Sequence, residues 1–346
     1  MGIYITIAVF LGVNTFLSFC KGIPKKYLYW FSLLLLIIVA SFRDLDVGTD
    51  TQQYFYNYKY IVEFKDRASF SGSQIIFYYY TLLCHYILTY DLFMIVSYGI
   101  AFGGVGWLIW KCSPYKILSL TLYFLLFYLA SLNVMRQYIS MGIYAVGLSY
   151  LFHDMKKEYL IYTLVAGCIH FSALLMIPLV FIRAFQIPKI TTVILVAASF
   201  YIGIFLNIMQ PVVQVFEIFS FLSDNVSGYI GNWGSEEGRN ILSNAIINMA
   251  FLLTYCLSNN IKSKAISLWF IFIIASNLLG AAGQANRIFL YLLLGAIIAV
   301  PEVLFQIRRN YGKRIVLFGF IFMYTVGFWM TQLVTGVNEV IPYKFR

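Results

Sequence analysis

The chain has 346 residues, of which 61% are hydrophobic and only 11% are charged. A soluble domain carries about 25% charged residues, so this composition excludes a soluble domain of any size. The formal net charge is +10. Most of the excess lies in short segments between apolar runs, which is the positive-inside pattern of a membrane protein and does not indicate nucleic-acid binding.

Apolar runs of about 20 residues, the length of a helix that crosses a bilayer, recur along the whole chain. They do not alternate apolar and polar residues, as the strands of a membrane barrel do. The sequence therefore predicts an all-α polytopic membrane protein, a single transmembrane domain over residues 1–346 with about 11 or 12 membrane-spanning helices. The predicted spans are residues 3–19, 28–42, 93–110, 117–132, 137–153, 159–182, 190–209, 241–258, 266–284, 288–306 and 315–334.

Basic loops set the expected orientation. The short segments 21–26, 262–264 and 308–314 carry lysine and arginine but no acidic residue, so we expect them to be cytoplasmic. This places two large loops, about residues 43–72 and 223–240, outside the cell.

The middle of the chain leaves two alternatives. Residues 73–90 are rich in tyrosine and either form a twelfth span or lie flat in the membrane interface. The basic segments 111–116 and 156–157 would also be cytoplasmic, but only if residues 73–90 do not cross the membrane.

Acidic residues gather in the first outer loop, beginning with Asp44, Asp46 and Asp50. Gly48 permits a turn that is closed to other residues. One interpretation is a solvated loop in which Asp50 caps a helix expected over residues 52–64. The other is that these carboxylates take part in chemistry.

Arg136 and Gln137 lie between two apolar runs, close to Asn133. A lone arginine at the end of a span often only extends to the headgroups. The neighbouring amides make a polar cluster, which favours a function.

Five cationic or titratable side chains could converge on an anion. Arginine suits phosphate because its planar fork binds two oxygens and stays charged. His170 is either an interhelical hydrogen-bond donor or a functional group. The Walker A and Rossmann glycine patterns and the His-Glu-x-x-His zinc pattern are absent. The five residues are Arg43, Arg136, Arg239, Arg287 and His170.

Four motifs, in this order along nearly the whole chain, resemble the EpsG family, whose members include Wzy-type O-antigen and exopolysaccharide polymerases. The motifs are Phe42-Arg-x3-Val-Gly-Thr-Asp50-x3-Tyr54, Asn133-x2-Arg136-Gln137, Ala166-x3-His170-x-Ser172-Ala-Leu and Ile341-Pro-Tyr343.

The resemblance implies a GT-C type glycosyltransferase in the bacterial cytoplasmic membrane, with its site on the outer face. The donor would be a glycan on undecaprenyl diphosphate and the acceptor a lipid-linked repeat unit, whose non-reducing sugar receives the growing chain. The product would be a polysaccharide such as the O antigen of lipopolysaccharide. Expected partners are membrane lipid, a chain-length regulator and a flippase, with no nucleic acid, cofactor or metal.

The residues fit this chemistry. The arginines, with Gln137 and Tyr54, would bind the diphosphate, and His170 would line or support the same cavity. An acceptor hydroxyl needs a carboxylate base, for which Asp50 is the first choice and Asp46 the second.

Three other functions remain open. A flippase or other transporter of lipid-linked oligosaccharide would use the same cations, but it would be expected to show two related halves. An O-antigen ligase would differ in its acceptor. A membrane O-acyltransferase would use His170 as its base.

Overall fold

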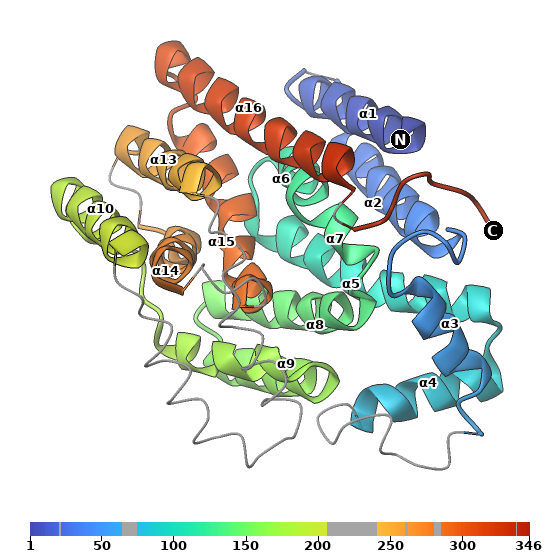
Figure 1. The fold of residues 1–346 in the computed structure, drawn as a ribbon. Helices are drawn as coiled ribbons and strands as arrows, with labels where there is room; N and C mark the ends of the chain where they lie inside the picture. The colour runs from blue at the N-terminus through green and yellow to red at the C-terminus, as the bar shows by residue number, and fades with distance from the viewer. Residues whose placement is uncertain (21, 64–74, 206–240, 260–261, 280–284, 337) are drawn as a thin grey trace. The chain divides into compact units, whose positions relative to one another are not determined.

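The structure, a computed structural model, describes residues 1–20, 22–63, 75–205, 241–259, 262–279, 285–336 and 338–346. Within these ranges the regular elements are helices and no strand forms (Figure 1), which confirms the all-α prediction. The described chain divides into two compact units, residues 1–180 with 325–346 (unit 1) and residues 181–324 (unit 2). A single domain over the whole chain stays a prediction.

The helices of unit 1 follow the predicted apolar runs closely. They are α1 (Gly2–Ser18), α2 (Lys25–Ser41), α3 (Thr51–Lys59), α4 (Ile75–Ile87), α5 (Tyr90–Cys112), α6 (Lys116–Tyr123), the π-helix η3 (Phe124–Tyr128), α7 (Leu129–Ser131), α8 (Met135–Phe152), α9 (Lys156–Ile169) and the 3₁₀-helix η4 (Phe171–Phe181), which ends in unit 2.

Unit 2 holds most of the remaining helices. They are α10 (Lys189–Phe205), α13 (Ile241–Leu257), α14 (Lys264–Leu279), α15 (Ala285–Gln306) and α16 (Tyr311–Thr335), whose last turns belong to unit 1.

Three described helices are long and apolar enough to cross a membrane, namely Tyr90–Cys112, Ile288–Gln306 and Tyr311–Thr335, and several shorter apolar helices accompany them. The chain is therefore a membrane protein, and the predicted number of spans stays a prediction. One predicted span, 159–182, is broken at His170, where α9 ends and η4 begins.

Glycines bring two helices of unit 1 into close contact. A Cβ added to Gly104 of α5 would lie 2.0 Å from the carbonyl oxygen of Gly142 in α8. Only glycine permits this approach, so the close α5–α8 contact depends on glycine at these two positions. Near the start of α5, the Tyr98 hydroxyl donates to the Ser131 carbonyl, just before α8. Further along both helices, Gly104 meets Gly142, so α5 and α8 run in the same direction.

Helices α2 and α5 run antiparallel. The Tyr29 hydroxyl near the start of α2 donates to the Gly106 carbonyl near the end of α5, at 2.6 Å. At the other end, the Ser41 hydroxyl lies 3.4 Å from the Met94 carbonyl. The end of α2 and the start of α5 therefore share one end of unit 1. It follows that α4, which lies between them in the chain, does not cross unit 1.

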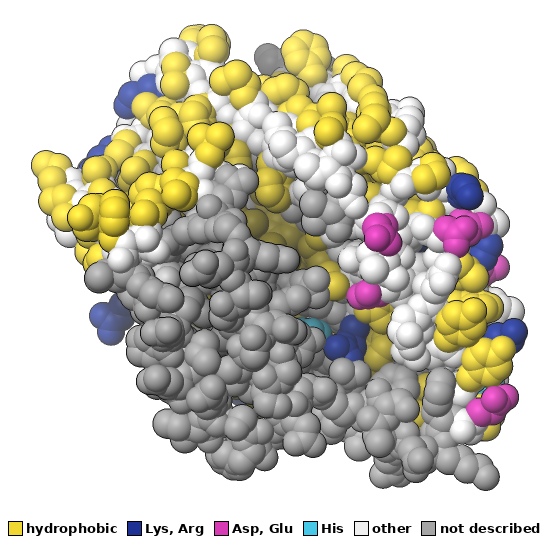
Figure 2. All heavy atoms as spheres, in the orientation of Figure 1, with side chains coloured by type: hydrophobic (Ala, Val, Ile, Leu, Met, Phe, Trp, Pro, Cys, Tyr) yellow, Lys and Arg dark blue, Asp and Glu magenta, His cyan; other side chains and the backbone are white. Residues whose placement is uncertain are grey.

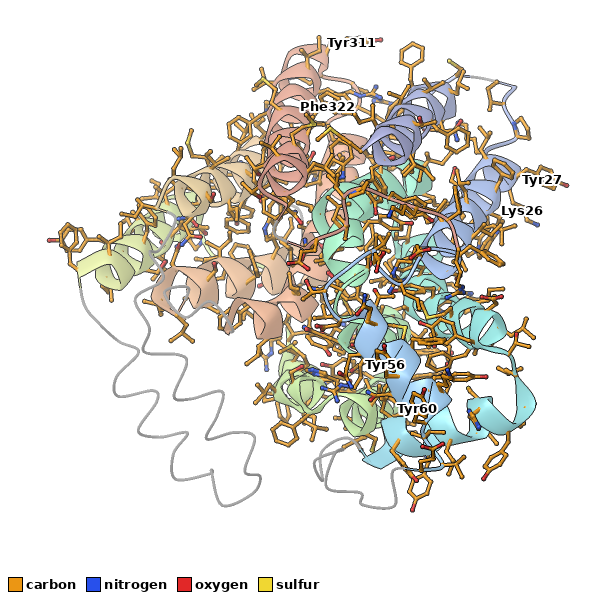
Figure 3. The ribbon with its side chains drawn as sticks, turned by 45° about the vertical axis from the view of Figure 1, so that its right-hand side comes forward. Lys26, Tyr27, Tyr56, Tyr60, Tyr311 and Phe322 are labelled. Carbon is orange, nitrogen blue, oxygen red and sulfur yellow. The ribbon has the colours of Figure 1, made fainter. Side chains whose placement is uncertain are left out.

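Unit 1 has a basic end, formed by the start of α2, the end of α5, the start of α6 and the α8–α9 turn. Trp110 packs against Trp30 at 5.3 Å, and the Lys116 ammonium lies 5.1 Å from the Trp110 ring centre. The lysines of segments 25–26, 111–116 and 156–157 all belong to this end. Figure 3 shows Lys26 and Tyr27 well separated from Tyr56 and Tyr60 on α3.

The opposite end, which we call the polar end, contains the end of α2, helices α3 and α4, the starts of α5 and α8 and the end of α9. Figure 2 shows acidic and basic side chains gathered around the loop after α2 and around α3.

In unit 2, buried amides join the helices. Asn277 of α14 donates to the Ser199 hydroxyl of α10 at 2.9 Å and accepts from Asn248 of α13 at 3.0 Å. Gln306 exchanges two hydrogen bonds of 2.9 Å with the backbone of Asn259, which brings the basic loops before α14 and after α15 to one end of this unit.

Candidate functional site

The loop after α2, residues 42–50, is held tightly at a glycine. Gly48 has φ +93°, and an added Cβ would lie 2.9 Å from the Leu132 carbonyl oxygen and 3.1 Å from the Thr51 hydroxyl. Both the backbone angle and the contact require glycine. This acidic loop therefore lies directly against the segment that precedes α8.

Arg43 is the interior support of the acidic loop. Its side chain is 0% exposed. The guanidinium donates to the carbonyls of Ala40 (2.5 Å), Val47 (3.2 Å) and Leu132 (2.8 Å), and to the Thr51 hydroxyl (3.2 Å). These acceptors are all neutral.

The aromatic ring of Tyr98 lies beneath the Arg43 guanidinium, 4.9 Å from ring centre to Cζ. The sequence predicted Arg43 as a diphosphate ligand. In the structure, its donors point to the protein itself and tie three stretches of backbone together.

Asp50 is the N-cap residue just before α3, but its side chain makes no capping hydrogen bond. Its backbone N–H donates to the Asn133 side-chain oxygen at 2.9 Å. The first and second family-like motifs are thus joined directly. The structural role that the sequence allowed for Asp50, a cap on the following helix, is not the one seen.

The other two aspartates of the loop are arranged differently. Asp44 is half-buried and accepts the backbone N–H of Asp46 at 3.2 Å. Asp46 is exposed and accepts from the Gln52 amide at 3.0 Å.

Tyr54, on the first turn of α3, connects Asp50 to the start of α8. Its hydroxyl accepts the backbone N–H of Arg136 at 3.4 Å. Burial raises the pKa of the Tyr54 hydroxyl and the Asp50 carboxylate adds to this, while the Arg136 guanidinium opposes it. Tyr54 therefore lies within the electrostatic reach of both a carboxylate and a guanidinium.

Arg136 itself is half-buried, in contrast to Arg43. Its guanidinium lies 6.0 Å from the centre of the Phe77 ring of α4. It can therefore reach a ligand at the polar end while an aromatic face supports it from one side.

His170 is brought to the same end by the α8–α9 hairpin. The Ala166 carbonyl accepts both the Ser140 hydroxyl of α8 at 2.8 Å and the His170 N–H at 2.9 Å. Ser140 lies one turn after Arg136. The break between α9 and η4 leaves His170 in an extended conformation, half-buried, with Nδ1 2.6 Å from the Ser172 hydroxyl oxygen.

The structure brings Asp50, Tyr54 and Arg136 together through contacts, and it places His170 and the buried Gln137 at the same end of the α8–α9 hairpin. Arg239 and the side chain of Arg287 lie outside the described residues. Among the residues that the structure describes, no group of three or more His, Cys, Asp or Glu side chains could hold a metal ion.

Sequence reasoning did not identify two contributions. Asn133 stood out only as part of a polar cluster, whereas its amide holds the amide of Asp50. Phe77, beneath Arg136, comes from the tyrosine-rich segment whose position the sequence left open. A contact between side chains 59 residues apart has no local signal in a single sequence.

These features define an all-helical membrane protein with a compact acidic, basic and aromatic site at one end of a helical unit. The chain belongs to the EpsG family, which it matches over residues 26–345. This is a family of Wzy-like polymerases and points to a polymerase-like role in making exopolysaccharide or O antigen. Neither a curated protein nor a solved structure matches the chain significantly.

Proposed function

We propose that the protein is a glycosyltransferase that polymerises a polysaccharide from undecaprenyl-diphosphate-linked units. The growing glycan leaves its diphosphate and joins the non-reducing end of a lipid-linked repeat unit. The observation that carries this proposal is the convergence of Asp50, Tyr54, Asn133 and Arg136 at the polar end of unit 1.

The reaction places two demands on the site. An acceptor hydroxyl attacks the anomeric carbon and gives up a proton, for which Asp50 is the proposed base and Asp46 the second choice. The bond from that carbon to the diphosphate breaks, and the departing oxygen gains negative charge.

Arg136 is the proposed ligand for that charge, because a guanidinium offers paired donors and does not lose its proton. Tyr54, Gln137 and His170 would hold the substrates by hydrogen bonds. Arg239 and Arg287 are proposed as further cations, and with arginines supplying the positive charge the reaction would be metal-independent.

The basic end of unit 1 supports an outward orientation for the site. Segments 25–26, 111–116 and 156–157 gather there, and such segments are retained in the cytoplasm. The polar end would then face the exterior of the cytoplasmic membrane, where GT-C polymerases act. Lipid-linked units would reach it through a flippase, and a chain-length regulator would be a further partner.

Purified protein incubated with its lipid-linked repeat unit tests the proposal. A ladder of products that differ by one repeat unit is expected, and Arg136→Ala should abolish it. Translocation of the lipid across vesicles without a ladder would instead favour a flippase. Transfer of a single finished chain to a lipid A core would favour a ligase.

A further inference from the structure

Residues 339–346, which we call the C-terminal strap, lie alongside the acidic loop within unit 1. Arg43 and Phe345 face each other in an isolated antiparallel bridge. Next to it, the Asp44 N–H donates to the Lys344 carbonyl at 2.9 Å. The strap therefore pairs with the acidic loop through backbone hydrogen bonds around this single bridge.

Two further backbone bonds extend this contact. The Arg346 N–H donates to the Phe42 carbonyl, and the Gly48 N–H donates to the Glu339 carbonyl at 3.0 Å. Three backbone hydrogen bonds thus join the strap to the first, third and seventh residues of the acidic loop, which spans residues 42–50.

Tyr343 anchors the strap to the helices. Its hydroxyl donates to the Val39 carbonyl of α2 at 2.6 Å, and its ring packs edge-on against Tyr4 of α1 at 5.5 Å. Tyr4 in turn donates to the carbonyl of Val340, which is buried. Burial raises the pKa of Tyr343 to about 12.

A second anchor lies at the other end of the strap. The Arg346 guanidinium forms an ion pair with Asp91, at the start of α5, and lies 4.6 Å from the ring centre of Tyr90. The strap is therefore tied to α1, α2 and α5, and not to the acidic loop alone.

We propose that the strap is a positioning element for the transfer reaction, with Tyr343 as its principal anchor. Arg43 and Gly48 fix the acidic loop against Leu132, and the strap holds the same loop through its own backbone hydrogen bonds. Asp50 keeps its position relative to Arg136 only while both supports hold. The catalytic part of this inference rests on the proposed function.

Three full-length variants test it: Tyr343→Ala, which removes the anchor, Tyr343→Phe, which keeps the ring, and Lys344→Ala as the matched control. The Lys344 side chain is exposed, and the control retains the carbonyl that Asp44 uses. Hydrogen exchange at the amides of Asp44 and Gly48 measures the strap, and initial rates of ladder formation measure the reaction.

Tyr343→Ala should speed exchange at both amides by about tenfold or more, because their acceptors move away. It should also lower kcat by about tenfold while KM changes less than about twofold, because the loop acts on the chemical step. Tyr343→Phe should retain most of the activity, and Lys344→Ala should match the unmodified protein in both measurements.

Two results would overturn the proposal: unchanged exchange in Tyr343→Ala, or faster exchange with an unchanged kcat. Failure of the proposed function is distinguishable, because unmodified protein would then give no ladder. The exchange measurements would still decide whether the strap holds the acidic loop.

Discussion

The same substitution, arginine to lysine, should have opposite consequences at two positions 93 residues apart in the sequence. At Arg43 the fork spans four neutral acceptors in a fully buried position. At Arg136 the side chain is half-buried and the guanidinium lies 6.0 Å from the Phe77 ring centre. Lysine keeps the charge at both positions but replaces the planar fork with a compact ammonium.

The expected magnitude at position 43 follows from counting acceptors. An ammonium has three donors on one atom, so it cannot reach Ala40, Val47, Leu132 and Thr51 together. Each buried acceptor left without a partner costs about 1–3 kcal/mol. We expect Arg43→Lys to lose about 2–4 kcal/mol of stability, which lowers the midpoint of thermal unfolding by about 2–4 °C per kcal/mol for a domain of this size.

At position 136 we expect the opposite result, a small change in stability and a large loss of activity. We expect Arg136→Lys to unfold within about 2 °C of the unmodified protein, because surface-accessible substitutions usually change stability by less than about 0.5 kcal/mol. Its rate of ladder formation should fall by about 10²-fold or more, since a point charge does not hold a diphosphate in bidentate geometry.

Thermal unfolding followed by intrinsic fluorescence, together with the ladder assay, separates the two effects. A stable Arg43→Lys protein with a strongly reduced rate would show that Arg43 contacts substrate after all. A fully active Arg136→Lys or Arg136→Ala protein would refute the assignment of the diphosphate to Arg136.

The remaining predictions concern the acidic loop and the histidine. Asp50→Asn should lower the rate by about 100-fold or more with expression retained, because an amide cannot accept the proton; an active Asp50→Asn beside an inactive Asp46→Asn would move the base to Asp46. His170→Ala should lose activity while the unmodified enzyme keeps full activity in a chelator, and chelator-sensitive polymerisation would contradict a metal-independent reaction. Gly48→Ala should cost about 1–3 kcal/mol in backbone strain, besides the contact with the Leu132 carbonyl, and should reduce activity as it displaces the loop. Unfolding at the unmodified midpoint would show that the loop accommodates a side chain at this position.

Much of the helical layout was predictable because an apolar run of fixed length is a strong signal. Most predicted spans agree with helices to within a few residues, as with 288–306 and α15 (Ala285–Gln306). The break at His170 was not predicted, since residues on both sides of it are equally apolar. The position of α4 could not be predicted either, because a tyrosine-rich segment fits a span and an interfacial helix alike.

The candidate site was predicted in composition but not in geometry. Asp50, Tyr54 and Arg136 were singled out from motif residues. In the structure Asp50 bonds to Asn133, and the Tyr54 hydroxyl accepts the backbone N–H of Arg136. Sequence could not show that Arg43 is completely enclosed, because burial depends on packing against segments far along the chain. The same limit applies to Tyr343, whose anchoring contacts are with α1 and α2.

The geometry divides the family-like residues according to which atoms they contact. Arg43, Gly48 and Asn133 interact with backbone atoms. Arg43 and Gly48 contact the Leu132 carbonyl, and the Asn133 side chain accepts the backbone N–H of Asp50. Backbone contacts carry no substrate specificity, and they would serve equally well for any sugar. Asp50 and Arg136 are instead the residues whose side chains we propose to act on the substrates. Under the proposed function, Arg43, Gly48 and Asn133 would hold the loop in place for any repeat unit, and only Asp50 and Arg136 of these five residues would meet the substrate.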